Sequence, residues 1–141
     1  MTLTWVFWAL LAAVFAAGTA LLAKAGVEHI DSNLATAIRT TVVFIFAWTI
    51  ALSFSAHHAM AFITKRGWIF LILSGLCTGI SWLCYFRALQ LGPVSAVAPI
   101  DKLSVALVLI FAWLFFGEAM TPLKILGGSL ITVGAILLAF A

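Results

Sequence analysis

The sequence predicts an all-α integral membrane protein with five transmembrane helices. Hydrophobic residues make up 66% of the 141 residues and charged residues only 8%, with a mean hydropathy of +1.29. Soluble domains carry about 25% charged residues, so this chain cannot cover a water-exposed surface. Apolar runs of about 20 residues recur along the whole chain, and each is long enough to cross the hydrocarbon core of a bilayer. We therefore expect a multi-pass protein of the cell membrane (inner or plasma membrane).

The five expected spans are joined by connections that are too short to fold by themselves. The first span is not expected to be a cleaved signal peptide, because no basic leader precedes it. Gly26 is a typical helix end, Asp31 is a good cap for the second span, and Pro122 is suited to the first position of the fifth. We expect one transmembrane domain over residues 1–141, with spans at residues 3–25, 34–55, 68–91, 94–116 and 122–140.

Two pairs of small residues lie on the third span. Gly75 and Gly79 have the GxxxG spacing, which predicts a face against which another helix packs closely. Cys77 and Cys84 lie about 10 Å apart along the same predicted helix. That separation is too large for a disulfide, so we interpret both as small apolar fillers.

Three charged residues are predicted to lie inside the membrane, all toward the side opposite the N-terminus. Arg39, Arg87 and Asp101 fall about 6 to 10 Å inside the hydrocarbon edge. A lone charge at this depth costs several kcal/mol on some scales, although an arginine is long enough to snorkel to the interface. Asp101 has a short side chain, so we expect it to pair with Arg39, with Arg87 or with both.

Two interpretations of these charges stay open. In one, a buried ion-pair network only fixes the register of the helices. In the other, the charges line a water-filled cavity, where the arginines bind an anionic or zwitterionic ligand and Asp101 exchanges protons. Pro99 favours the cavity, because it removes a backbone donor and predicts a helix that begins late or kinks just before Asp101. Broken helices at membrane depth line cavities in transporters.

The candidate substrate-binding or coupling residues extend beyond the three charges. Trp82 and Tyr85 lie three apart on one face of the third span and are placed to form an apolar wall of the cavity. Lys102 adjoins Asp101 in the fourth span. The full candidate set is Arg39, Trp82, Tyr85, Arg87, Asp101 and Lys102.

An enzyme is not expected, because no nucleophile lies beside a base inside the spans. The adjacent His57 and His58 are interpreted as part of a solvated loop, since no cysteine or carboxylate accompanies them and neighbouring side chains rarely converge on a metal. We expect no metal and no cofactor. The basic residues form no stripe that would suit a nucleic acid. Membrane lipid and a small-molecule substrate are the expected partners.

Three stretches of the second half carry a resemblance to a known family. They are Arg87-Ala-Leu-Gln-Leu-Gly-Pro-Val-Ser-Ala-Val-Ala-Pro-Ile-Asp-Lys-Leu-Ser104, then Phe-Gly-Glu118-Ala-Met-Thr-Pro122, then Leu-Gly-Gly-Ser-Leu-Ile-Thr-Val-Gly134. Together they resemble an EamA domain of the drug/metabolite transporter superfamily. The resemblance implies that the five spans form one EamA-type repeat. It also implies that Glu118 is a structural cap or gate residue rather than the coupling acid, and we group it with Pro99, Gly75 and Gly79.

The same resemblance implies a function and an assembly. A secondary transporter is expected, exporting a small metabolite such as an amino acid or a similar solute by alternating access. Family members commonly carry ten spans, as two halves of opposite orientation, so a chain of half that size is expected to form a homodimer. An antiparallel pairing is permitted, because basic residues near the span ends number three on the N-terminal side and four on the other. The alternative is a non-transporting membrane subunit that assembles with another membrane protein.

Overall fold

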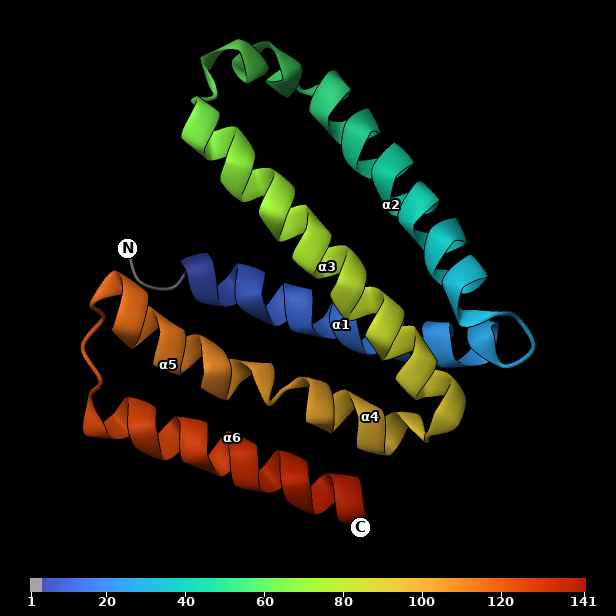
Figure 1. Cartoon of the computed structure of the whole chain (residues 1–141), viewed down its shortest axis with the longest axis vertical. Coiled ribbons are helices and arrows are strands. Elements are labelled where there is room, and N and C mark those ends of the chain that lie inside the picture. The colour runs from blue at the N-terminus through green and yellow to red at the C-terminus, as the bar shows by residue number, and fades with distance from the viewer. Residues whose placement is uncertain (1–3) are drawn as a thin grey trace. The chain divides into compact units, whose positions relative to one another are not determined.

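The computed structural model describes residues 4–141, which form helices joined by short connections (Figure 1). No strand occurs within this range. Five helical segments are long and apolar enough to cross a membrane, with α4 and α5 together forming the fourth. The predicted fold class is therefore confirmed. In chain order the elements are α1 (Thr4–Val27), α2 (Ser32–Ser53), the 3-10 helix η1 (Ala56–Phe62), α3 (Lys65–Leu91), α4 (Val94–Asp101), α5 (Ser104–Phe116) and α6 (Pro122–Phe140).

The helices begin and end close to the predicted spans, and the local sequence explains the differences. α2 begins two residues earlier than the predicted 34 because Asp31 caps it. The Asp31 carboxylate accepts hydrogen bonds from the backbone N–H groups of Asn33 (2.9 Å) and Leu34 (3.2 Å). Such a cap satisfies donors that have no partner inside the helix. α3 begins at Lys65, before the predicted Trp68, so its first turn carries basic residues.

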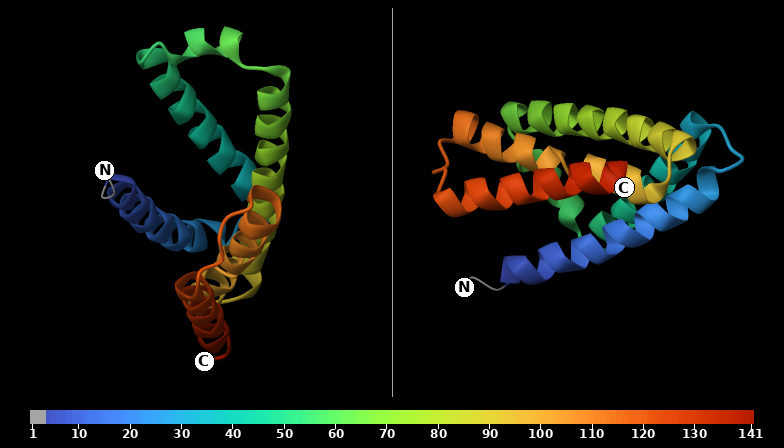
Figure 2. Two further views of the ribbon diagram at one scale, coloured as in Figure 1. Left: turned by 90° about the vertical axis from the view of Figure 1, so that its left-hand side faces the viewer. Right: turned by 90° about the horizontal axis from the view of Figure 1, so that it is seen from below.

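The chain divides into two compact units. The α2–α3 unit comprises Ala25–Gln90, and the α4–α6 unit comprises Met1–Lys24 with Leu91–Ala141. In the α2–α3 unit, η1 joins the end of α2 to the start of α3 (Figure 2). The chain turns between α2 and η1 at Ser55, whose φ of 53° lies in the left-handed region.

A small core lies at the opposite end of the α2–α3 unit. The side chains of Val27 and Leu89 are fully buried, and Phe86 is 3% exposed. Two polar residues, Ser32 and Thr36, are also buried. The Thr36 hydroxyl donates to the backbone carbonyl of Ser32 at 2.8 Å, which satisfies it without a partner from another helix. This core holds the end of α3 against the connection that leads into α2.

The fourth span is broken, although not where the sequence suggested. α4 starts directly after Pro93 and contains Pro99, so the expected late start is wrong, and the expected kink just before Asp101 stays a prediction. The break follows Asp101, at Lys102 and Leu103, and separates α4 from α5 (Figure 1). There the backbone N–H of Lys102 bonds to the Pro99 carbonyl (2.9 Å) and that of Leu103 to Ile100 (3.0 Å). These bonds span three residues rather than four, which tightens the turn and interrupts the α-helix.

In the α4–α6 unit, α6 packs along both α4 and α5 (Figures 1 and 2). α5 ends at Gly117, whose φ of 63° is left-handed and suits glycine. The side chain of Thr121 accepts a hydrogen bond from the backbone N–H of Lys124 at 3.3 Å and so caps α6. α5 and α6 approach closely at Gly128, where an added Cβ would lie 2.7 Å from Leu109 Cδ1.

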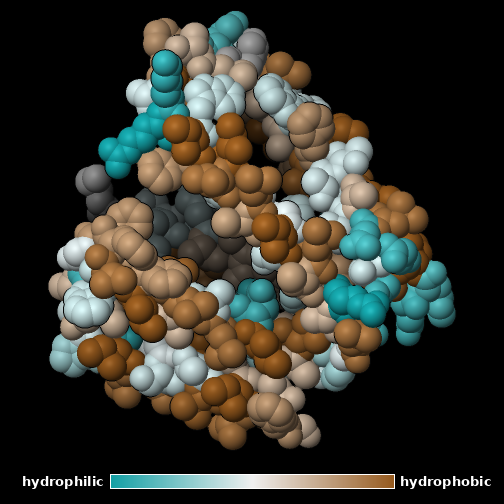
Figure 3. All heavy atoms as spheres, in the orientation of Figure 1, coloured by the Kyte–Doolittle hydropathy of each residue, from teal (hydrophilic) through white to brown (hydrophobic). Residues whose placement is uncertain are grey.

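The surface of the chain is predominantly apolar. Large leucine, isoleucine, valine, phenylalanine and tryptophan side chains are exposed along every membrane-length helix. Hydrophobic residues also dominate the face in Figure 3, where hydrophilic side chains form separate clusters. Helices satisfy their own backbone hydrogen bonds, which lets such a surface lie in hydrocarbon rather than in water. The protein is thus a multi-pass membrane protein.

Candidate functional site

The clearest candidate site in the α2–α3 unit is built around Arg39. The guanidinium carbon of Arg39, on α2, lies 4.3 Å from the centroid of the Trp82 ring and 5.4 Å from that of Phe86, both on α3. Trp82 and Phe86 are four residues apart, so they lie on the same face of α3. The structure therefore brings together two predicted residues, Arg39 and Trp82, and adds Phe86, which the sequence did not single out. The predicted role of Tyr85 stays a prediction.

The position of Arg39 makes this contact consequential. Arg39 lies about 10 Å along α2 from its first residue, which is well inside an apolar span. The α2–α3 unit holds two carboxylates, Glu28 and Asp31, and neither forms an ion pair with Arg39. An aromatic face attracts a cation through its quadrupole and is worth about 0.5 to 2 kcal/mol, depending on desolvation. Within this unit, the rings rather than a carboxylate stabilise the charge.

The cation–π contacts supply no hydrogen-bond acceptor in the plane of the Arg39 guanidinium. A guanidinium is planar, and its five N–H donors point outward in the plane, so a ring over its face does not occupy them. In the described part of the chain, Arg39 donates no hydrogen bond. Carboxylates and phosphates match this edge bidentately. The geometry suits recognition of an anionic group.

Arg87 has a different environment from Arg39. Its Nη1 donates to Oε1 of Gln90 at 3.1 Å, within the last turns of α3. The Gln90 amide in turn donates to the backbone carbonyl of Ile30 at 2.6 Å and, more weakly, to that of Val27 at 3.4 Å. Gln90 thus links the end of α3 to the connection between α1 and α2. Sequence reasoning did not identify this linking role, because nothing local to Gln90 indicates which distant carbonyls it reaches.

Asp101 lies at the break between α4 and α5, where its Oδ2 pairs with Nζ of the adjacent Lys102 at 2.9 Å. The Asp101 side chain is 37% exposed in the chain. The structure therefore gives this acid a partner of its own within the α4–α6 unit. The expected pairing of Asp101 with Arg39 or Arg87 stays a prediction, and so does its part in proton exchange.

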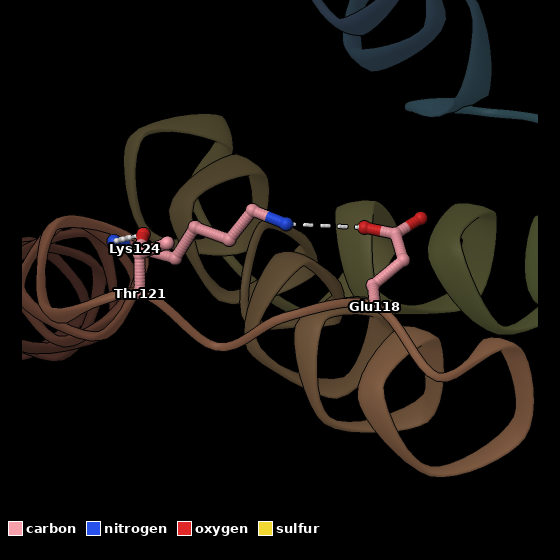
Figure 4. Close-up of polar contacts among 3 residues, drawn as sticks. All are labelled: Glu118, Thr121 and Lys124. Atoms are coloured by element: carbon pink, nitrogen blue, oxygen red, sulfur yellow. Dashed lines mark hydrogen bonds and ion pairs between the residues drawn. The ribbon is translucent and has the colours of Figure 1, made fainter.

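Glu118 lies in the connection between α5 and α6, as expected for a residue that follows the end of the fourth span. Its Oε2 pairs with Nζ of Lys124 at 3.2 Å, and the capping residue Thr121 lies beside Lys124 (Figure 4). The backbone N–H of Glu118 donates to the carbonyl of Ala112 at 3.2 Å, which helps to end α5. These contacts are compatible with the predicted structural or gate role of Glu118.

The remaining predicted features have fewer contacts. Within the α2–α3 unit, a Cβ added to Gly75 or Gly79 would meet nothing within 4 Å, so this face has no helix packed against it there. Cys77 and Cys84 are free and exposed. Among the described residues, no group of three His, Cys, Asp or Glu side chains is placed to hold a metal. The side chain of His57 lies outside the described residues.

A groove that the sequence did not predict lies between α5 and α6. It has a volume of about 330 Å³ and is lined mainly by apolar side chains, with Lys124 and Met120 near the connection between the helices. The hollow arises because small residues, Ala106, Gly128 and Ser129, face it from both helices. Small residues on a single span are common in membrane proteins, so the sequence alone did not distinguish this set.

Comparison with known proteins agrees with this membrane architecture. A family profile described as "EamA-like transporter family" matches residues 3–140, which is nearly the whole chain. The protein belongs to the EamA-like transporter family. The resemblance inferred from the second half of the sequence is confirmed, and it extends over all five spans of this EamA protein.

A relative of similar length also matches the EamA protein. It is a Sinorhizobium sp protein named "Uncharacterized transporter in cobO 3'region" and is 50% identical over 139 residues. The alignment covers 99% of each of the two chains. No solved structure gives a significant match. The family and this relative support a transporter role for the EamA protein. The chain and this relative therefore match over nearly their whole lengths.

Proposed function

We propose that the EamA protein is a secondary transporter that exports a small metabolite, an amino acid or a similar solute, by alternating access. The observation that carries this proposal is the cation–π contact of Arg39 with Trp82, in which Arg39 donates no hydrogen bond to any other described residue. A charge at membrane depth marks a functional site when it faces a cavity or a ligand. The family match and the named relative support the transport role independently of this contact.

The proposed substrate class follows from the donors that Arg39 offers. A planar fork of N–H groups binds a carboxylate through two parallel hydrogen bonds, and these are charge-assisted and therefore strong. The Trp82 and Phe86 rings hold the fork in one orientation, so less conformational entropy is lost when the ligand binds. A solute with a carboxylate, such as an amino acid, fits this chemistry.

Asp101 is the proposed coupling group. It lies directly before the break in the fourth span, and broken helices in transporters border the substrate and ion sites. A carboxylate there changes its charge when it takes up a proton, and that change alters its attraction for Lys102. Proton binding on one side and release on the other would then bias the two access states of the protein.

We further propose that two copies of the EamA protein form the transporting unit in the cell (inner or plasma) membrane. Gly75 and Gly79 give α3 a face on which an added Cβ meets nothing within the α2–α3 unit. A small-residue face lets a second helix approach closely in lipid. The second candidate function, a non-transporting subunit, is favoured by the same open face, which can equally receive a different membrane protein.

Transport in proteoliposomes tests the main proposal. The purified EamA protein is reconstituted, and uptake is measured with a panel of labelled amino acids under an imposed proton gradient. Arg39→Gln should lower transport of the accepted solute at least about tenfold, the loss expected when one charge-assisted contact worth about 1.5 kcal/mol or more is removed. Asp101→Asn should abolish the dependence on the proton gradient.

Arg66 provides the matched control. Its guanidinium carbon lies 5.6 Å from the centroid of Phe70, so it also makes a cation–π contact, but it is in the first turn of α3. Arg66→Lys, which removes the guanidinium but keeps the basic charge that influences orientation, should leave transport unchanged. Normal transport by Arg39→Gln would refute the assigned role of Arg39. A stable complex with another membrane protein, together with no transport by the wild type, would favour the non-transporting subunit.

A further inference from the structure

The groove between α5 and α6 has the length of one membrane leaflet. Along α6, its lining runs from Lys124 to Val133. Nine residues of helix correspond to about 14 Å, which is close to half of the roughly 30 Å hydrocarbon core. Because α6 begins at Pro122, the Lys124 end of the groove lies at the boundary of the membrane and the Val133 end lies near its middle.

The interior of the groove suits a hydrocarbon chain. Leu109, Ile110 and Ile125 contribute apolar side chains to its walls. Thr132 also lines it, but its hydroxyl donates to the backbone carbonyl of Gly128 at 2.8 Å, so its donor is satisfied inside α6. A hydroxyl bonded in this way needs no polar group from an occupant.

The mouth of the groove carries two opposite charges side by side. Lys124 Nζ and Glu118 Oε2 are 3.2 Å apart, and the side chains remain 40% and 57% exposed (Figure 4). An ammonium has three N–H donors and a carboxylate has two acceptor oxygens, so this single contact does not exhaust either group. A ligand with a negative and a positive group close together can therefore contact both residues at once.

We propose that this groove binds one acyl chain of a phosphatidylethanolamine-type phospholipid from the bilayer. The lipid phosphate accepts hydrogen bonds from Lys124, and the primary ammonium of the headgroup donates to Glu118. A choline headgroup has no N–H to donate, and an anionic glycerol headgroup brings no cation to Glu118. The charge pattern at the mouth thus selects among lipids, while the groove sets the position of the chain. This site does not depend on which solute is transported.

Native mass spectrometry with defined lipids tests the proposal. The full-length protein is delipidated in detergent and titrated separately with phosphatidylethanolamine, phosphatidylcholine and phosphatidylglycerol of identical acyl chains. The protein should bind phosphatidylethanolamine about fivefold more tightly than either of the other two lipids. This factor corresponds to about 1 kcal/mol, the upper end of the range for an exposed ion pair. Equal affinity for all three lipids would overturn the proposal.

Two protein variants separate the contact with the lipid phosphate from the contact with the headgroup ammonium. Lys124→Ala should weaken binding of all three lipids, because each has a phosphate. Glu118→Gln should remove the preference for phosphatidylethanolamine over phosphatidylglycerol while leaving binding of the latter unchanged or stronger. Glu118→Gln is nearly isosteric on an exposed side chain, so it tests the proposal even where a groove variant fails to fold. A preference that survives this variant would overturn the role of Glu118.

A groove-filling variant tests the acyl-chain site. Ser129→Leu places a large side chain in the lining and should lower phosphatidylethanolamine affinity at least about fivefold, a loss equivalent to excluding one or two buried methylene groups. The matched control is Ser74→Leu, at an exposed position on α3 that is not part of the groove. Unchanged lipid binding in Ser129→Leu would overturn the site. If that variant instead dissociated dimers without affecting lipid, the groove would belong to a second copy of the chain, and the proposal would be wrong.

Discussion

The guanidinium carbon of Arg39 lies 4.3 Å from the centroid of the Trp82 ring, which joins α2 to α3 inside an apolar span. A carboxylate in that place would neutralise the charge and consume the donors of the guanidinium. The ring instead stabilises the cation without accepting a hydrogen bond from it, so the N–H donors remain available to a ligand. A protein that only needed to fix helix register would gain more from an apolar pair, because buried charges are costly to retain.

Trp82 should therefore affect substrate affinity rather than insertion. Trp82→Phe keeps an aromatic face and should raise the apparent KM for transport less than threefold. Trp82→Leu removes it, and loss of a cation–π contact of about 1 kcal/mol corresponds to a KM about fivefold higher. Transport kinetics in proteoliposomes measure both effects. Trp68→Leu, on the same helix but with no cation over its ring among the described residues, is the control and should match the wild type. Equal kinetics for Trp82→Leu and Trp68→Leu would contradict the prediction.

Gln90 should hold the connection between α1 and α2 in place. Gln90→Ala removes the hydrogen bond to the Ile30 carbonyl and leaves that carbonyl without its amide donor. The expected loss is about 1 to 2 kcal/mol of stability, and backbone amide exchange in the connection should accelerate. Hydrogen exchange with mass spectrometry in detergent measures it.

Arg87 supplies the comparison for Gln90. Arg87→Ala removes only the contact at Gln90 Oε1 and leaves the bond from the Gln90 amide to Ile30 available. Its effect on exchange in the connection should be clearly smaller than that of Gln90→Ala. Equal acceleration in the two variants would mean that Gln90 does not act through the Ile30 carbonyl.

Gly117 should tolerate substitution worse than another glycine close to it in sequence. Its φ of 63° is left-handed, and an L-residue there costs about 1 to 2 kcal/mol. Gly117→Ala should lower the midpoint of thermal denaturation in detergent. Gly127→Ala is the control, because Gly127 lies within α6 and a Cβ there meets nothing within 4 Å. That variant should be neutral or slightly stabilising, since alanine favours a helix more than glycine does. A larger loss for Gly127→Ala would contradict this account.

The near balance of basic residues predicts insertion in both orientations. Reporters that are active only inside or only outside the cell, fused after Ala141, should both give a signal. Activity of one reporter alone would exclude dual orientation. Two double substitutions then test assembly. Ala61→Lys with Phe62→Lys should favour one orientation, and Glu28→Lys with His29→Lys should favour the other. If the transporter is an antiparallel dimer, each biased chain alone should be inactive and the two expressed together should restore transport. Full activity of either chain alone would refute antiparallel pairing.

Much of the architecture was predictable because it rests on local properties. The length and apolar character of each run determine whether it crosses the membrane, and neither depends on distant residues. The same holds for the cap at Asp31 and for Pro122 at the first position of α6, because both act on backbone groups within one turn. The family resemblance also depends on local motifs, and for that reason it was recognisable before any contact was known.

The break in the fourth span shows where local reasoning was insufficient. A proline lowers helix stability around its own position, yet the helix continues through Pro99 and is interrupted only at Lys102 and Leu103. The packing of α6 along both α4 and α5 supports the segment on either side of the break. A proline predicts only that a helix is weakened, whereas packing against neighbouring helices determines where the helix is interrupted.

The sequence alone determined that this is a five-span membrane protein of the EamA-like transporter family, because hydropathy and motifs are properties of continuous segments. Only the tertiary structure decided which groups meet the charges. It placed Trp82 and Phe86 against Arg39. It also placed the Gln90 amide within hydrogen-bond distance of the Ile30 carbonyl, and Lys124 beside Glu118 at the mouth of a groove. Each of these contacts joins side chains to groups in another segment of the chain, and the direction of a side chain around its helix is set by packing rather than by the residue's own identity.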